Sequence, residues 1–261
     1  MTENRDINYK GSSSGRIPNN LSSAKEIVPL LFQAIKPSSV IDVGCGTGVW
    51  ISECKRNGAD RIQGIDGEWV LPNKLFINED ELEIYDFENT DKEPQCVNSD
   101  HYDMAICLEM AEHVSRAKAD YVIDVLTKAA DVIYFSAATP YSGGMHHVNE
   151  CWQSYWISKF KERGFLAIDY IRPKVWNNKK VCYFYAEESF IFVKKERLSE
   201  FPLLQEAYQE GFIADIVHPI HFKEQIIKPT HDWSYLFSMQ KRLKNAYINK
   251  IKMEWKLFGR R

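Results

Sequence analysis

The segment that most constrains the fold is an apolar run that ends in a glycine-rich turn, V-I-D-V-G-C-G-T-G over residues 40–48. Glycines at positions 44, 46 and 48 let the backbone turn sharply and let a ligand approach where a side chain would clash. This pattern is typical of a buried strand followed by a helix beside a nucleotide-binding site. A dinucleotide fingerprint would require glycine or alanine where Val49 stands, so the pattern disfavours NAD.

Short apolar runs alternate with helical periodicity between Leu21 and Ser199, which predicts an α/β fold with a mostly parallel sheet covered by helices. We expect a first helix that Ser22 or Ser23 caps and that ends before Pro37. The last strand follows without a clear crossover helix, which leaves room for an antiparallel final pair. The expected strands are 39–43, 61–65, 82–86, 102–108, 131–137, 165–170 and 189–194, with further helices near 48–57, 115–129 and 153–163.

The pattern divides the 261-residue chain into three parts. Residues 1–20 are polar and are expected to form a flexible segment, and residues 21–198 form the main domain. Residues 199–261 form an extension with a long basic helix over 233–258. Apolar side chains recur along that helix at three- and four-residue steps, which predicts either packing on its own domain or a homo-oligomer.

Composition and charge narrow the class of protein. The chain is 44% hydrophobic and 26% charged, which excludes a disordered protein, and its six cysteines form no CxxC pair. The N-terminus lacks a signal peptide and no apolar run reaches the length of a membrane span, so we expect a cytoplasmic protein. The net charge of −3 combines +7 from Lys223 to Arg261 with −10 over the preceding residues, so general nucleic-acid binding is not expected.

Acidic residues also follow the next three predicted strands. Asp66 lies in G-I-D-G, Asp86 in Y-D-F and Glu109 in C-L-E-M-A-E-H-V. Because the carboxyl ends of parallel strands meet at one edge of a sheet, these side chains are expected to share a ligand site. A carboxylate there can accept both hydroxyls of a ribose, and an acid beside an aromatic ring suits an adenine.

Over about residues 38–194 the chain resembles the class I S-adenosylmethionine-dependent methyltransferases. The resemblance implies a doubly wound, mostly parallel, Rossmann-like methyltransferase fold. It implies S-adenosylmethionine as the cofactor, with S-adenosylhomocysteine as the product. The matching positions that would bind the cofactor are Asp42, Gly44, Cys45, Gly46, Asp66, Gly67, Asp86, Phe87, Leu108 and Glu109.

The resemblance also implies a role for each of these positions. The turn at 44–46 would pass beside the methionine moiety, with Asp42 near its amino group, and Asp66 would bind the ribose hydroxyls. The pair at 86–87 would face the adenine, and the pair at 108–109 would lie beside the homocysteine part.

The segment over residues 138–152 follows the fifth strand and therefore lies at the same edge. It resembles the H-x-N-E-x-W stretch of methyltransferases from surface-polysaccharide and phage gene clusters. A sugar hydroxyl is a poor nucleophile until its proton leaves, and a neutral imidazole can accept that proton. His146 and His147 are therefore candidate bases, with His147 favoured because Glu150 follows it by three residues. A role in substrate binding or helix capping is the alternative.

A metal site is a rival interpretation of the same region. Glu109, Glu112 and His113 form E-x-x-E-H, and with His147 they resemble the metal site of small-RNA 2′-O-methyltransferases. The element also occurs in metal-free relatives, where the glutamate favours a helix N-terminus. We therefore expect no metal and full activity after chelation.

The leading expectation is an O-methyltransferase that acts on a small carbohydrate-type acceptor in surface-polysaccharide (capsule) biosynthesis. Methylation of RNA ribose is the second interpretation, suggested by E-x-x-E-H and the basic C-terminal residues. A non-catalytic S-adenosylmethionine-binding partner protein is the third.

Overall fold

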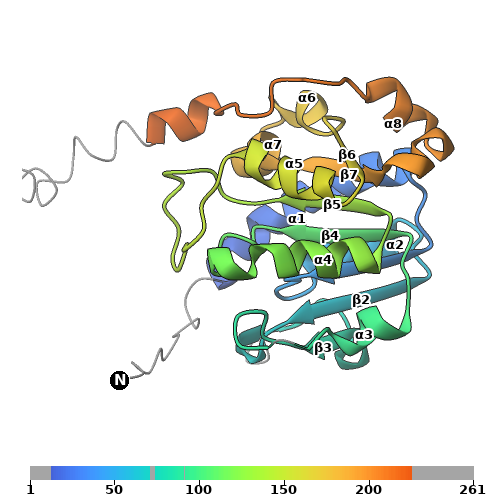
Figure 1. Cartoon of the computed structure of the whole chain (residues 1–261). Helices are drawn as coiled ribbons and strands as arrows, with labels where there is room; N and C mark the ends of the chain where they lie inside the picture. The colour runs from blue at the N-terminus through green and yellow to red at the C-terminus, as the bar shows by residue number, and fades with distance from the viewer. Residues whose placement is uncertain (1–12, 71–73, 91, 225–261) are drawn as a thin grey trace, which may run out of the picture. The chain divides into compact units, whose positions relative to one another are not determined.

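The computed structural model describes residues 13–70, 74–90 and 92–224, and within them seven strands form one sheet of order β3-β2-β1-β4-β5-β7-β6 (Figure 1). The strands are β1 Ser39–Val43, β2 Arg61–Asp66, β3 Leu82–Ile84, β4 Met104–Leu108, β5 Val132–Ser136, β6 Phe165–Ile168 and β7 Phe190–Lys194. Every one of them lies within an expected range or extends it by a single residue. The predicted α/β fold with a mostly parallel seven-stranded sheet is confirmed.

Strand β7 is the antiparallel member of the sheet. It pairs antiparallel with both β5 and β6, whereas the pairs among β1 to β5 are parallel. Strands β4 and β5 are buried along their whole length, because helices cover both faces of a parallel sheet. This double burial explains why their sequences are continuous apolar runs.

Two helical layers cover the sheet. One face packs against α1 and α2, where Ala24, Ile27, Val28 and Leu31 recur at three- and four-residue steps. The other face packs against α4 and α5, and Figure 1 shows α4 on the near face of the sheet. The helices are α1 Ser13–Ala34, α2 Val49–Arg56, α3 Gln95–Ser99, α4 Ala119–Ala129, α5 Gln153–Glu162, α6 Arg172–Val175, α7 Tyr183–Glu188 and α8 Pro202–Ala207. Single 3₁₀ turns are η2 Glu68–Val70, η3 Glu79–Glu81 and η4 Arg116–Lys118, and a longer one is η5 Lys195–Glu200.

The expected N-cap of the first helix is wrong. Helix α1 begins at Ser13, so Ser22 and Ser23 lie in its interior. Their hydroxyls bond instead to the segment that precedes α7: Ser22 Oγ donates to the Lys180 carbonyl at 2.8 Å, and the Cys182 N–H donates to Ser23 Oγ at 3.0 Å. A serine in this sequence context therefore serves tertiary packing and does not begin the helix.

The expected boundary at residue 198 differs from the structure. The compact unit that holds the sheet extends to His218, and Phe201 and Leu204 are buried in the cluster that includes α1. Residues 219–261 form a second unit. Two predicted segments lie outside the described residues: residues 1–12 of the flexible segment and the basic helix over 233–258. The homo-oligomer was predicted from that helix and stays a prediction. No helix among the described residues has the length and apolar character needed to cross a membrane.

Arg172 ties together three segments of the sheet-containing unit. Its guanidinium is 1% exposed, pairs with Asp169 at 2.7 and 2.9 Å, and lies 4.1 Å from the centre of the Phe190 ring. It also donates to the carbonyls of Glu187 at 3.2 Å and Ala214 at 2.8 Å. A buried, fully bonded guanidinium of this kind is expensive to remove, because its partners lose their compensation.

We predict that Arg172→Ala lowers the free energy of unfolding by about 3 kcal/mol, because it breaks a buried ion pair and leaves the two carbonyls without this donor. The measurement is chemical denaturation followed by circular dichroism. Arg197→Ala is the matched control, since Arg197 is one-third exposed and pairs with Glu200 on η5, and it should cost less than about 1 kcal/mol. Equal losses in the two variants would contradict the account.

Candidate active site

The turn after β1 depends on its glycines. Gly44 and Gly48 have φ angles of 82° and 80°, in the left-handed region that other residues rarely adopt. A Cβ at Gly44 would lie 2.3 Å from Cγ of Met110, so no side chain fits there. The turn therefore passes close to the end of β4, as the sequence predicted for a strand-to-helix turn at a ligand site.

Asp66 joins the ends of β1 and β2. Its carboxylate accepts hydrogen bonds of 2.7 Å from the N–H groups of Gly46 and Gly67, and a further one from the Trp69 side chain. Burial raises the pKa of Asp66 to about 6, and these hydrogen bonds limit the rise. The Trp69 ring lies directly against Gly67, where a Cβ would be 2.2 Å from it.

Asp42 adds a second buried acid to this edge. It is 2% exposed, and burial together with the nearby Asp66 carboxylate raises its pKa well above the usual value. No lysine or arginine in the described parts of the chain forms a salt bridge with either acid. Cys45 is also buried, and its thiol pKa is raised by burial and by both acids. A positively charged ligand would offset this concentration of negative charge.

The pair at 86–87 is held by local contacts. Asp86 accepts hydrogen bonds from the N–H groups of Glu88 and Asn89, so it forms an Asx turn that fixes the chain after β3. Phe87 is 6% exposed and packs edge-on against Tyr85, 4.7 Å between ring centres. Phe87 is thus part of the buried cluster on this side of the sheet, and its place beside the adenine stays a prediction.

The end of β4 carries a strained residue. Leu108 is buried, and Glu109 has a φ angle of 54°, which is unusual for a residue with a side chain. The Ser136 hydroxyl at the end of β5 donates to Glu109 at 2.7 Å.

Glu188 is a second buried carboxyl group beside Glu109. Burial and the Glu109 charge raise the pKa of Glu188 well above its usual value. Glu188 also accepts from the Thr139 N–H at 3.0 Å, so this buried carboxyl, which the sequence did not reveal, fixes the start of the loop after β5.

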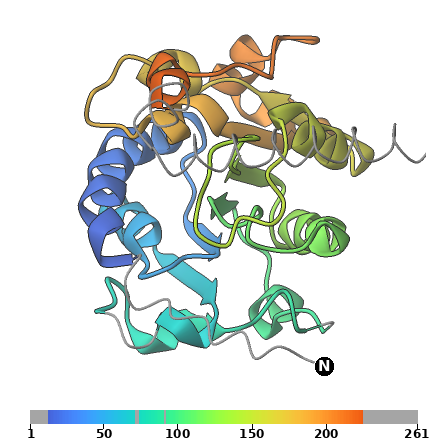
Figure 2. The same cartoon turned by 90° about the vertical axis from the view of Figure 1, so that its left-hand side faces the viewer.

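Glu150 organises that loop, residues 139–152. Its carboxylate accepts from the N–H groups of Tyr141 and Gly143, both at 2.9 Å, and from Nδ1 of His147 at 2.9 Å. In Figure 1 the parallel strands end on the left, on the same side as the yellow-green loop, and Figure 2 looks onto this side. The predicted relation between His147 and Glu150 is therefore present in the structure.

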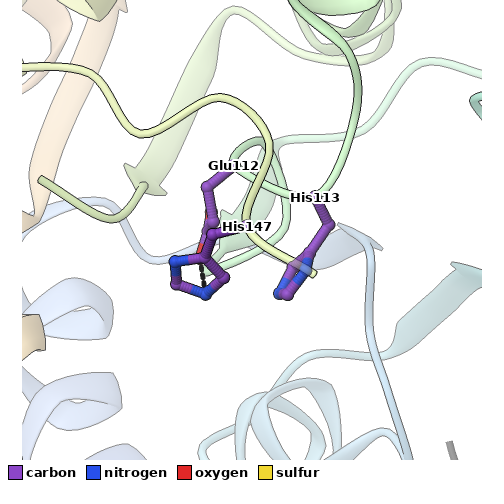
Figure 3. A group of neighbouring side chains, drawn as sticks. All are labelled: Glu112, His113 and His147. Carbon is purple, nitrogen blue, oxygen red and sulfur yellow. Dashed lines mark ion pairs between the residues drawn. The ribbon is translucent and has the colours of Figure 1, made fainter. Parts of the chain in front are cut away.

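His147 joins two residues from the end of β4 in what we call the His–Glu cluster, consisting of Glu112, His113 and His147 (Figure 3). Nε2 of His147 lies 3.9 Å from an oxygen of the buried Glu112, and the rings of His113 and His147 lie 4.8 Å apart, edge to face. The backbone carbonyl of Glu112 accepts from the N–H groups of Val148 and Asn149, at 2.9 and 3.1 Å, which ties the loop to the turn after β4.

Glu109, Gly144 and His146 lie around this cluster. Glu109, the fourth member of the rival metal set, lies outside the His–Glu cluster and bonds to Ser136. His146 is exposed and has a φ angle of 63°. Gly144 makes room for the imidazole, since a Cβ there would lie 2.0 Å from Nε2 of His147.

Comparison with known proteins now identifies the family. A family model described as a methyltransferase domain matches residues 20–184, more than half of the chain. The ubiquinone biosynthesis O-methyltransferase of Salmonella newport is 31% identical over 100 residues, which are 37% of this chain and 41% of that protein. The chain thus matches about two-fifths of the length of such curated relatives.

Two solved methyltransferase structures are also similar to the chain. DesVI of Streptomyces venezuelae has a TM-score of 0.48 at 12% identity, over 69% of this chain and 94% of that chain. The magnesium protoporphyrin IX methyltransferase of Synechocystis PCC 6803 has a TM-score of 0.43 at 16% identity, over 67% of this chain and 80% of that one. The chain belongs to the methyltransferase domain family, as a class I S-adenosylmethionine-dependent methyltransferase.

Proposed function

We propose that the chain transfers the methyl group of S-adenosylmethionine to a hydroxyl oxygen of a small polar acceptor of the carbohydrate type, in the cytoplasmic steps of surface-polysaccharide biosynthesis. The observation that carries this proposal is the His147 imidazole, which Glu150 holds at the carboxyl edge of the sheet. Two further features support it: the curated relatives are named O-methyltransferases, and the loop resembles those of surface-polysaccharide methyltransferases.

The cofactor roles follow from charge. S-adenosylmethionine carries a positive sulfonium and a positive amino group, and Asp42 and Asp66 are buried acids without a basic partner among the described residues. Asp66 would accept the ribose hydroxyls, and Asp42 would lie near the amino group beside the 44–46 turn. Asp86 would lie beside the adenine, and Phe87 would line the same site from its buried position against Tyr85.

The acceptor chemistry requires the loss of one proton. The acceptor oxygen attacks the sulfonium methyl carbon, the C–O bond forms, the S–C bond breaks, and S-adenosylhomocysteine leaves as a neutral thioether. The hydroxyl proton has to leave as well. His147 serves this step by one of two routes: its neutral imidazole accepts the proton, or it helps to hold a cation that lowers the pKa of the hydroxyl.

The two other interpretations have less support. Two features suggested RNA ribose. The basic segment lies mainly outside the described residues, and Glu109 of the E-x-x-E-H element lies outside the His–Glu cluster. A non-catalytic binding protein has no need of a histidine held by a carboxylate, and Gly144 leaves room for that imidazole. An acceptor screen tests the proposal: nucleotide sugars and RNA oligonucleotides are each incubated with S-adenosylmethionine, and S-adenosylhomocysteine is measured. Methylation of RNA with no transfer to any sugar would contradict it.

Lowering the pH should weaken S-adenosylmethionine binding through Asp66. The carboxyl group accepts hydrogen bonds at both oxygens only when ionised, and its pKa is about 6, so affinity should fall by up to tenfold for each pH unit below that value. Calorimetric titration between pH 5 and 7 measures the slope. In Asp66→Asn the binding should be weaker at pH 7 by roughly 1.5–3 kcal/mol, the value of a charge-assisted hydrogen bond, and its slope should be smaller. An unchanged slope in this variant would remove the ribose assignment.

Replacing His147 with alanine should reduce turnover by roughly 10²–10⁴-fold and leave S-adenosylmethionine affinity nearly unchanged, because the imidazole acts on the acceptor. Steady-state kinetics and calorimetry provide the two readings. His146→Ala is the neighbouring comparison, and it should retain most of the turnover because that side chain is exposed.

Gly144→Ala tests the position of the imidazole without removing it. The added methyl would displace the ring from its place beside Glu112, so turnover should fall while the cofactor still binds. Full turnover in both His147→Ala and Gly144→Ala would exclude His147 from the reaction.

A further inference from the structure

We propose that the His–Glu cluster binds a divalent transition-metal ion, contrary to the expectation from sequence that the site is metal-free. The proposal rests on the proposed function for the role of the ion, and on the geometry of three side chains for its existence. Glu112, His113 and His147 each direct one ligand atom to a common region, and these atoms all lie within 4.8 Å of one another.

The separations approach those around one ion. Ligand atoms that are each about 2.0–2.2 Å from a tetrahedral ion lie roughly 3.3–3.6 Å apart. Nε2 of His147 and the Glu112 oxygen are 3.9 Å apart, and all three ligand atoms lie within 4.8 Å of one another. Side-chain rotation would have to close these separations by up to about 1.4 Å when an ion binds.

The tautomer of His147 favours a ligand role for Nε2. The Glu150 carboxylate can only accept a hydrogen bond from Nδ1, so in the neutral imidazole Nδ1 carries the hydrogen and Nε2 carries the lone pair. Nε2 lies 3.9 Å from an oxygen of Glu112, a residue with no exposed surface, and the His113 and His147 rings are 4.8 Å apart. A histidine whose second nitrogen is bound to a carboxylate is the usual arrangement around protein-bound metals.

The cluster is also held in place by its backbone. Two main-chain hydrogen bonds to the Glu112 carbonyl fix the loop residues that flank His147, and Glu150 secures the loop at Tyr141 and Gly143. Glu112 and His113 lie in the turn after β4, four and five residues beyond the end of that strand. Ligands that are positioned before binding lose little freedom when an ion arrives.

The donor set selects the ion. Two imidazoles and one carboxylate suit Zn²⁺, Fe²⁺ or Mn²⁺, and three protein ligands leave coordination positions open for a substrate. An acceptor hydroxyl at an open position would lose its proton to solvent more readily, because the positive charge lowers its pKa. The oxygen would then take the sulfonium methyl, with S-adenosylhomocysteine as the leaving group.

Cation binding tests the proposal without reference to turnover. The untagged full chain is treated with a chelator, desalted and titrated calorimetrically with ZnCl₂ and, separately, with MnCl₂. We expect one ion per chain, and affinity at least tenfold weaker in Glu112→Gln, His113→Ala and His147→Ala. Glu150→Gln should weaken binding by about 10–100-fold, as expected for a residue that orients a ligand. His101→Ala is the control. This exposed histidine lies just before β4, at the amino end of the strand, so the variant should bind the ion as the unaltered chain does.

S-adenosylmethionine titration of the same samples separates the outcomes. If the chain and its variants bind the cofactor but neither cation, or if the ligand variants keep full cation affinity, the metal proposal is overturned and the proposed function stands. Cation binding that requires these three residues supports the metal site even if no acceptor is methylated, and that result would count against the proposed function alone. Turnover that falls on chelation and returns with Zn²⁺ or Mn²⁺ would support both.

Discussion

The hydrogen bond from the Gly46 N–H to Asp66 is the interaction on which the site depends. It connects the carboxyl ends of β1 and β2, and it uses a carboxylate whose burial raises its pKa to about 6. Asp42, buried beside it, adds a second acid. This edge is therefore electrostatically unfavourable without a cationic ligand, which suits a cofactor with a sulfonium group.

Most of the fold could be predicted because strong local signals agreed with the tertiary structure. Strands β4 and β5 are covered on both faces, so their apolar runs marked them clearly. Short helices were harder to predict: α6 has four residues and α7 six, too few to show a helical period. Ser23 resembled an N-cap, but its hydroxyl bonds to a residue 159 positions away, a contact that no local pattern contains.

The site could be predicted where a residue's role follows from its place at a strand end. The pairing of His147 with Glu150 followed from their three-residue spacing. The packing of the Phe87 ring against Tyr85 did not follow from the sequence, because Y-D-F gives no indication of how the two rings contact each other. The convergence of His113 and His147 depends on the path of a loop, and so does the separation of Glu109 from them. Such long-range packing is set by contacts such as those of the Glu112 carbonyl.

In the proposed function, cofactor and acceptor bind at the same edge of the sheet, with the reacting methyl group between them. A crystal structure of the full chain with S-adenosylmethionine would test this arrangement. We expect the ribose hydroxyls to donate to Asp66 and the sulfonium methyl to point toward the His–Glu cluster. A complex in which the methyl group points away from Glu112, His113 and His147 would contradict it.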